Sequence, residues 1–574
     1  MILQTLTSYY NRTARDGGDI AAPGFQKQQI PFLIVLNSEG RFVDLQDTRS
    51  GEGKKKVGRT FTVPKAIKKT SGIAANLFWD TPAYVLGRPK PDQNDAPEKA
   101  EKQRGAFLDR MKEIFPAPNA NVAVAAIFRF LEGNDFQTLL NHPSWKEIEE
   151  KGLVLSFKLD TDNCLVCERQ DIVNVLAGTK PSTKGNGICL VDGEVDTPVR
   201  LHTAIKGVWG AQTSGANIVS FNLKAFTSFN KEQGLNAPVG QRAEFAYTTA
   251  LNILLQKGSR QRIQVGDAST VFWAEKKHAM EDVFADIFGE PPKDNPVQDY
   301  KSLVAVFRAP ETGSKPELDP NTRFFVLGLA PNAARIAVRF WYDGTVKEVA
   351  DHIYQHFEDC SIIHGPNQPE TLSLFRMLVS TALQGKSENI QPNLAGDFMR
   401  TILAGTPYPQ TLLAAAIRRL RAEHEAAYPR IALIKAVLVR ESRYYNKNHR
   451  EVGMALDKAN CNIGYRLGRL FAALEKVQEE ANPGINATIR DRFYGAASST
   501  PVAAFSQLMK LKNHHISKLD NRGRAVNLER IIGEIVDGIA EFPTYLSLGD
   551  QGRFAVGYYH QRQDFFTKKD EQQI

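Results

Sequence analysis

The hydrophobic period of the chain changes near residue 372, and this change limits the fold more than any other feature. After it, apolar residues recur at the 3.6-residue spacing of amphipathic helices, in runs such as TLLAAAIRRLRAEHE and NIGYRLGRLFAALEKVQEE. Before it, from about residue 152, come short strand-like runs that include VLSFKL, ANIVSFN, SLVAVFR, FFVLGL and ARIAVRFWY. The pattern predicts an α+β chain, with a sheet-rich middle region at 151–371 and an all-α helical bundle at 372–574.

The first 150 residues combine both patterns. MILQTLTSYYNRTA has helical spacing, and IPFLIVLN (30–37) and FVDLQ (42–46) flank a Gly-containing connection, as in a β-hairpin. Residues 88–104 are proline-rich and charged without an apolar period, which predicts a linker or a long surface loop, and the helical patterns FLDRMKEIF and VAVAAIFRFLE follow. Residues 1–150 are therefore predicted to form a mixed α/β region with antiparallel-type sheets.

Charge favours a polyanionic partner. Lys and Arg number 72 against 64 Asp and Glu, giving a net charge of +8 and a pI near 9.0, so nucleic acid is the leading candidate. No apolar run approaches the roughly 18 residues of a membrane span. The N-terminus lacks the pattern of a secretory signal, so a cytoplasmic location without membrane contact is expected.

Motifs for catalysis or metal binding are missing. The sequence contains no GxxxxGK[ST], strand-linked GxGxxG, HExxH or GxSxG, so a non-enzyme without a cofactor is favoured. The five cysteines are odd in number and scattered, which is typical of reduced thiols. Cys164 and Cys167 have the spacing of a zinc knuckle, but only Cys189 lies near as a third ligand, so no metal is predicted and the pair stays an open question.

Two Gly-containing segments carry exposed cationic or polar patterns. Residues 49–72, RSGEGKKKVGRTFTVPKAIKKTSG, hold eight Lys or Arg and one Glu. Residues 202–217, HTAIKGVWGAQTSGAN, alternate glycines with Lys206, Gln212 and Ser214, which lets the backbone approach phosphates or groove edges closely. A solvated surface loop and a tight structural turn are the respective alternatives.

Several long motifs resemble one known family. They are LHTAIKGVWGAQTSGANIVSFN, VLGLAPNAARIAVRFW, GYRLGRLFAALEKVQ, RDRFYGAASSTPVAAF, MILQTLTSYY and KKTSGIAANLFWDTPAYVLG. They are similar to the Csd-type large subunit of the type I-C CRISPR surveillance complex, Cascade. In place of the Arg expected before TSG this chain has Lys69, which keeps the charge but loses a bidentate fork.

The resemblance implies a function without catalysis. Such a subunit belongs to a CRISPR RNA complex with backbone and RNA-processing subunits, recognises the protospacer-adjacent motif in double-stranded DNA, helps to unwind it, and recruits a helicase-nuclease. The guide RNA reads the long sequence by base pairing. A stand-alone nuclease with an unrecognised site and a general DNA-packaging protein are the competing hypotheses.

The resemblance also suggests roles for individual residues. Contacts to duplex phosphates are expected from Lys54, Lys55, Lys56 and Arg59. The adjacent motif is expected to meet Lys68, Lys69, Thr70, Ser71 and Asn76, with Lys206, Gln212 and Ser214 as a second group acting as a wedge or groove contact. The displaced strand is expected to follow Arg466, Arg469, Arg492, Lys510, Lys512 and His514, because Arg466 and Arg469 fall on the predicted exposed side of their helix.

In this family the small subunits are thought to be translated from inside the same gene. Met454 lies where such a start would release residues 454–574 with the last helices. An ordinary buried methionine is the alternative explanation of this residue.

Overall fold

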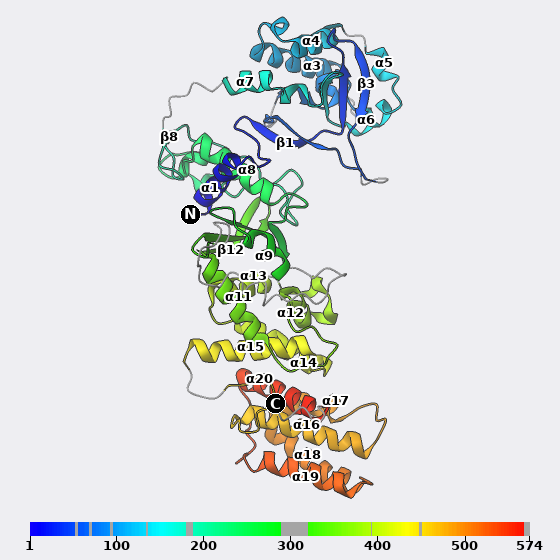
Figure 1. Cartoon of the computed structure of the whole chain (residues 1–574), viewed down its shortest axis with the longest axis vertical. Coiled ribbons are helices and arrows are strands. Elements are labelled where there is room, and N and C mark those ends of the chain that lie inside the picture. Colours follow the sequence, from blue (N-terminus) through cyan, green and yellow to red (C-terminus); the bar gives the residue numbers. More distant parts are fainter. Residues whose placement is uncertain are drawn as a thin grey trace. The chain divides into compact units, whose positions relative to one another are not determined.

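The computed structural model describes residues 1–51, 56–67, 72–91, 96–133, 136–178, 187–288, 319–391, 393–446 and 451–566. The chain forms two compact units (Figure 1). The first contains Met1–Thr203 and Ser220–Ile253, and the second contains Ala204–Val219 and Leu254–Ile574. The Gly-rich segment at 204–219 therefore belongs to the second unit, whereas the residues before and after it in the sequence belong to the first.

The first unit is built on a four-stranded sheet in the order β3-β2-β6-β5. The predicted hairpin is confirmed: β2 (Phe32–Leu36) pairs antiparallel with β3 (Phe42–Asp47). On its other side β2 pairs parallel with β6 (Leu155–Leu159), which in turn meets β5 (Trp79–Asp80). All five residues of β2 are buried, because FLIVL is the central strand and both of its faces are covered.

Helices cover one face of this sheet. Phe107 of α3 (Ala96–Ile114) meets Phe157 of β6 with ring centroids 6.4 Å apart, and α4 (Val122–Gly133) adds a largely buried apolar helix. The unit also contains the short helices α2 (Pro82–Val85), α5 (Gln137–Leu140), α6 (Trp145–Lys151) and α7 (Gln170–Gly178).

The remaining elements of the first unit form smaller groups. β1 (Phe25–Gln29) and β4 (Thr60–Pro64) make an antiparallel ribbon, and β7 (Gly187–Ile188) pairs with β8 (Val195–Asp196). α1 (Ile2–Arg15), the predicted first helix, packs against α8 (Gln241–Leu254) through Tyr10 and Phe245, whose ring centroids lie 5.6 Å apart.

Two local predictions differ from the structure. α3 begins at Ala96, inside the stretch 88–104 predicted as a linker, because Ala, Glu, Lys, Gln and Arg are strong helix formers even without an apolar period. The run ANIVSFN at 216–222 forms no strand; only isolated bridges occur there, at Ala216 and Asn217. The predicted strand SLVAVFR lies outside the described residues.

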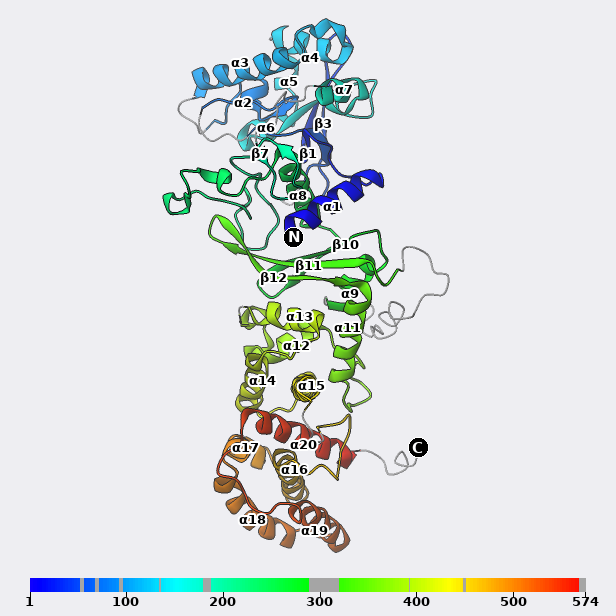
Figure 2. The ribbon, with the colours of Figure 1, turned by 90° about the vertical axis from the view of Figure 1, so that its left-hand side faces the viewer.

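The second unit begins with an antiparallel sheet in the order β12-β11-β10-β9 (Figure 2). Its strands are β9 (Arg262–Val265), β10 (Ala268–Ala274), β11 (Arg323–Asn332) and β12 (Arg335–Thr345), and β10 is buried throughout. α9 (Met280–Phe288) packs on this sheet through Phe284, whose ring lies 4.6 Å from that of Phe272. α11 (Val346–Cys360) follows β12 directly, started by a capping box between Thr345 and Glu348.

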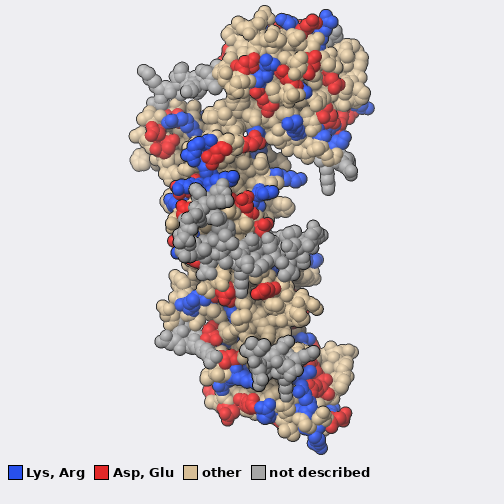
Figure 3. All heavy atoms as spheres, in the orientation of Figure 1, with Lys and Arg blue, Asp and Glu red and all other residues tan. Residues whose placement is uncertain are grey.

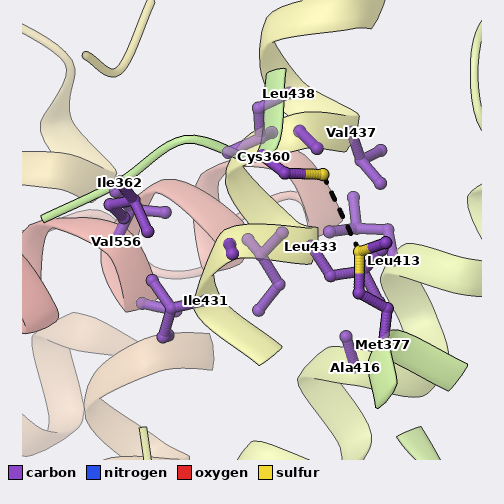
Figure 4. Packing of buried hydrophobic residues seen from close by; sticks show 14 of the residues in the cluster. Cys360, Ile362, Met377, Leu413, Ala416, Ile431, Leu433, Val437, Leu438 and Val556 are labelled. Carbon is purple, nitrogen blue, oxygen red and sulfur yellow. Dashed lines mark hydrogen bonds between the residues drawn. The ribbon is translucent and has the colours of Figure 1, made fainter. Parts of the chain in front are cut away.

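The rest of the second unit is helical, as the 3.6-residue period predicts. The helices are α12 (Leu374–Thr381), α13 (Leu394–Ala404), α14 (Gln410–Glu423), α15 (Tyr428–Tyr444), α16 (Ile463–Ala481), α17 (Ile489–Ser499), α18 (Pro501–Ser517), α19 (Arg522–Val536) and α20 (Leu548–Phe566). α20 lies between α15 and α16 (Figures 1 and 2), and its core contacts include Val556 beside Ile431 and Ile362 (Figure 4).

Glycines set the close crossing of α16 and α20. A Cβ added at Gly468 would lie 2.0 Å from the Phe554 carbonyl oxygen, and one at Gly557 would lie 2.2 Å from that of Tyr465. No side chain fits at either position, so the two backbones touch directly.

A buried carboxylate joins α11 to α15. Asp359 is 1% exposed, and its two oxygens accept hydrogen bonds from Arg440 Nε at 2.8 Å and from Arg443 Nη1 and Nη2 at 2.7 and 2.8 Å. Lys435 Nζ donates to the Asp359 carbonyl oxygen at 2.9 Å. Burial by itself raises the pKa of Asp359, but Arg443 and Arg440 outweigh it and hold that pKa below its ordinary value.

Replacing Asp359 with alanine is expected to lower the free energy of unfolding by about 3 to 5 kcal/mol, because Arg440 would stay buried without its counter-charge. Urea unfolding followed by circular dichroism measures this change. The matched control is Asp397→Ala, whose partner Arg400 lies 3.5 Å away in an exposed pair, with an expected loss of about 0.5 kcal/mol or less. Equal urea midpoints for the two variants would contradict the structural role of Asp359.

Candidate nucleic-acid interface

The Gly-rich segment forms a closed loop in the second unit. Ile205 and Ala216 pair by two backbone hydrogen bonds of 2.8 and 2.9 Å, which joins the ends of residues 206–215. Gly207 and Gly215 have φ of +88° and +93°, and a Cβ at Gly207 would lie 2.6 Å from the Leu255 carbonyl oxygen. The turn therefore requires glycine for both conformation and space.

A buried side chain and a hydrogen bond to the sheet hold the loop in place, and the loop carries an exposed aromatic residue. Val208 is buried, and the backbone N–H of Trp209 donates to Ser269 Oγ of β10 at 2.9 Å. The Trp209 residue itself remains 67% exposed. The backbone is thus held in place while the indole faces solvent.

The polar residues predicted for this segment share the same loop. Lys206, Gln212 and Ser214 are all exposed. Together with Trp209 they supply a cation, hydrogen-bonding groups and a flat aromatic surface, which are the groups that contact phosphates, base edges and unstacked bases respectively. The sequence prediction missed Trp209, although a tryptophan between two glycines was the visible signal.

The cationic N-terminal segment is described only in part. Lys54, Lys55, Lys68, Lys69, Thr70 and Ser71 lie outside the described residues. Ser50 and Val57 pair by two backbone hydrogen bonds of 3.0 Å and so close the chain around residues 51–56. Lys56 and Arg59, beside this closure, are exposed.

Arg49 anchors the base of that segment. Its guanidinium pairs with Asp47 at 2.8 Å and with Glu147 at 2.9 Å, and lies 4.5 Å above the centre of the Phe32 ring. The hydrogen bonds from Arg49 and Lys151 lower the pKa of Glu147 to about 2. Arg49 is therefore committed to the fold, unlike Lys56 and Arg59.

Asn76 does not present its amide to solvent. It is 5% exposed, its Oδ1 accepts a hydrogen bond from the Ile67 N–H at 3.0 Å, and its own N–H donates to Asp80 Oδ2 at 3.0 Å. The structure thus corrects the expectation that Asn76 reaches a groove edge. A buried amide needs partners, and here it fixes the chain on either side of residues 68–75.

The prediction that Arg469 lies on an exposed face of its helix is wrong. Arg469 is 5% exposed and donates from Nε to Gln561 Oε1 at 3.2 Å and from Nη1 to the Lys458 carbonyl oxygen at 3.3 Å. Burial lowers its pKa. α16 packs against α18, α19 and α20, so the side assumed to face solvent is covered.

The other predicted residues of the bundle divide into two groups. Arg466 is half-buried and donates to the Asn460 carbonyl oxygen at 2.9 Å, and Lys512 pairs with Glu529 at 3.7 Å. Arg492, Lys510 and His514 are exposed, and within the described part of the chain Arg492 and Lys510 have no acidic partner. These three residues are the ones available to a ligand.

The surface charge is mixed. Figure 3 shows Lys and Arg side chains interspersed with Asp and Glu over the face in view. The positive surplus does not form one broad patch on that face.

The described residues give no support for a metal site. Cys167 is buried, which raises the pKa of its thiol, and its Sγ donates to the Thr62 carbonyl oxygen at 3.8 Å. Among the described residues no group of three or more His, Cys, Asp and Glu is placed to hold a metal ion. No helix in that part of the chain combines the length and apolar character that crossing a bilayer requires.

Comparison with known proteins identifies the family of the chain. Residues 6–566 match the model of the family described as CRISPR-associated protein (Cas_Csd1). No curated protein matches the chain.

Removing one buried and one exposed arginine of the bundle is expected to have different effects, the first on stability and the second on binding of single-stranded DNA. Arg469→Ala should cost about 1 to 3 kcal/mol of unfolding free energy, because it leaves buried partners unsatisfied. Arg492→Ala should change stability by about 0.5 kcal/mol or less, yet reduce the slope of log affinity for single-stranded DNA against log salt by about 0.7. Urea unfolding and salt titration of oligonucleotide binding measure the two effects; an unchanged slope for Arg492→Ala would remove it from the interface.

Proposed function

We infer the function of this chain from its family, because it belongs to the CRISPR-associated Csd1 family. It is accordingly a CRISPR-associated subunit of the Cascade type. We propose that it is the large subunit of a type I-C Cascade, recognises the protospacer-adjacent motif in double-stranded DNA, helps to open the duplex, holds the displaced strand and recruits the helicase-nuclease. The observation that carries this proposal is the pinned loop at 206–215 with its exposed tryptophan.

The loop has the chemistry of a duplex wedge. Proteins that kink or open DNA insert an apolar side chain between base steps and recover the unstacking cost through contacts to the backbone. In this proposal Trp209 stacks on a base beside the adjacent motif, Lys206 approaches a phosphate, and Gln212 and Ser214 offer hydrogen bonds to groove edges. Pinning by Ser269 and Val208 supports the role, since a rigid wedge loses little conformational entropy on binding.

The N-terminal segment supplies further contacts in the proposal. Lys54, Lys55, Lys56 and Arg59 neutralise duplex phosphates, and Lys68, Lys69, Thr70 and Ser71 meet the adjacent motif. Asn76 acts as a positioning residue for this stretch through its hydrogen bond from Ile67. Fixed ends with donors between them support a role in binding, because the ends set where the donors are presented.

The displaced strand follows the exposed residues of α17 and α18. Arg492, Lys510 and His514 are the proposed contacts, and they provide charge for the backbone and a ring for a base. Arg466, Arg469 and Lys512 instead support the fold through their contacts within the bundle.

The proposed subunit has no catalytic step and no cofactor, and its partners are the CRISPR RNA with the other Cascade subunits, target DNA and the helicase-nuclease. An internal start at Met454 is also proposed, which would yield a small subunit containing α16 to α20. Met454 is 58% exposed, so it is not the buried methionine of the alternative explanation.

Trp209→Ala is expected to weaken binding of the assembled guide complex to a matching duplex by about 5-fold to 100-fold, the worth of one stacked base. A gel shift compares duplexes that differ only in the adjacent motif, and Lys68→Ala tests whether discrimination between motifs depends on the N-terminal segment. The control is Tyr545→Ala, which removes another exposed aromatic residue of the same unit. Wild-type affinity of Trp209→Ala, or motif-independent binding by the wild type, would overturn the proposal.

A further inference from the structure

The sheet of the first unit has a second face, opposite to the one that carries Phe157 and meets α3. Leu33 pairs with Gln46 across β2 and β3, and Val35 pairs with Lys158 across β2 and β6. Because residues two apart on a strand share a face, Leu33, Gln46 and Lys158 lie together. Strand β4 and the turn after β6 enclose this face, leaving a cavity of about 180 Å³ that we call the β-face pocket.

The β-face pocket is lined by cations and amides. Arg59 and Lys158 are its charged groups, and Gln46 and Asn163 add hydrogen-bonding side chains. The Arg59 guanidinium lies 5.2 Å from the centre of the Phe61 ring, which also lines the pocket. No carboxylate lines the pocket, and among the described residues neither Arg59 nor Lys158 forms an ion pair.

Two acidic residues near the pocket, Asp162 and Glu168, have other partners. Asp162 pairs with Arg169 at 2.7 Å. Glu168 accepts hydrogen bonds from the Thr62 N–H at 2.9 Å and the Leu165 N–H at 3.1 Å. Arg59 and Lys158 therefore line a small cavity and have no ion-pair partner among the described residues.

We propose that the β-face pocket binds a phosphate group. Arg59 offers a planar fork of donors, Lys158 adds a compact charge, and the two amides can satisfy further phosphate oxygens. The volume equals that of about six waters at about 30 Å³ each, enough for a phosphate with part of its sugar.

The position of the pocket favours a nucleic-acid backbone as the source of the phosphate. Arg59 lies two residues beyond Val57, which closes the chain around the cationic residues 51–56. A phosphodiester held here would anchor the strand that the neighbouring lysines contact. This assignment rests on the proposed function, whereas the affinity for phosphate follows from the pocket itself.

Cys164 is a built-in reporter of occupancy, because it lines the pocket and is partly exposed. Cys167, Cys189 and Cys360 are buried, and Cys461 is the other exposed cysteine. In a Cys461→Ser background, alkylation of Cys164 by N-ethylmaleimide is followed by peptide mass spectrometry. One arm uses the assembled guide complex with and without target duplex, and the other uses the purified chain with and without inorganic pyrophosphate.

Target DNA at ten times its Kd is expected to slow Cys164 alkylation about ten-fold, in proportion to occupancy. The double variant Arg59→Gln with Lys158→Gln should show no protection. In addition, Lys158→Ala should reduce the salt slope of duplex binding by about 0.9, while the control Lys146→Ala, an exposed lysine on α6, should leave it unchanged.

The two arms separate the pocket from the function. Protection by pyrophosphate alone assigns a free anion to the pocket, and protection by DNA alone assigns a backbone phosphate. Equal alkylation rates in every arm, or protection that persists in the double variant, would overturn the pocket. If the guide complex discriminates between motifs while Cys164 stays unprotected, phosphate binding by the pocket is rejected and the proposed function stands. If only pyrophosphate protects Cys164 and the complex does not discriminate between motifs, the proposed function is rejected and phosphate binding by the pocket stands.

Discussion

The second unit depends on the buried carboxylate of Asp359. Two arginines and a lysine from α15 converge on the last turn of α11, and a buried charge of either sign would be costly without the other. The interaction fixes where the helix that leaves the sheet meets the helix that supports α20. Around it, apolar residues such as Cys360, Met377 and Leu433 fill the space between the helices (Figure 4). The sheet that pins the 206–215 loop and the helices of the bundle are thereby parts of one packed body.

The segments that hold the candidate contact residues share one feature, which is that backbone or side-chain hydrogen bonds fix their ends. Ile205 and Ala216 close one loop, Ser50 and Val57 close another, and Asn76 holds a third stretch through Ile67. Each closure removes conformational freedom before a ligand arrives, so less entropy is lost on binding. For a protein whose partner is a long polyanion, such fixed presentation gives position, while charge alone would give only attraction.

The sequence predicted the features that depend on local periodicity. The β2–β3 hairpin and the helices after residue 372 follow from patterns within a few residues. Arg469 was predicted to be exposed because the helical period identifies one apolar face of α16. The helix in fact packs against several other helices, so the side that carries Arg469 is also buried. Asn76 was misplaced because a polar residue type predicts exposure, while its environment supplies the hydrogen bonds that allow burial. The β-face pocket could not be predicted from the sequence. Lys158 and Arg59 line the same pocket because β2 pairs in parallel with β6, which follows about 120 residues later in the chain.

The net charge of the chain does not by itself set the affinity for the DNA of the proposed function. In the bundle many basic residues are committed to ion pairs, including Arg524 with Glu480, Arg553 with Glu451 and Arg562 with Glu475. A cation held by a carboxylate cannot replace a counterion of a phosphate chain, so the salt-dependent part of the affinity follows the number of phosphate contacts and not the surplus of +8. In the proposed function, weak sequence-independent binding would be an advantage, because tight binding would delay release from the wrong sites. Pairing by the guide RNA would then supply most of the affinity for a matching target.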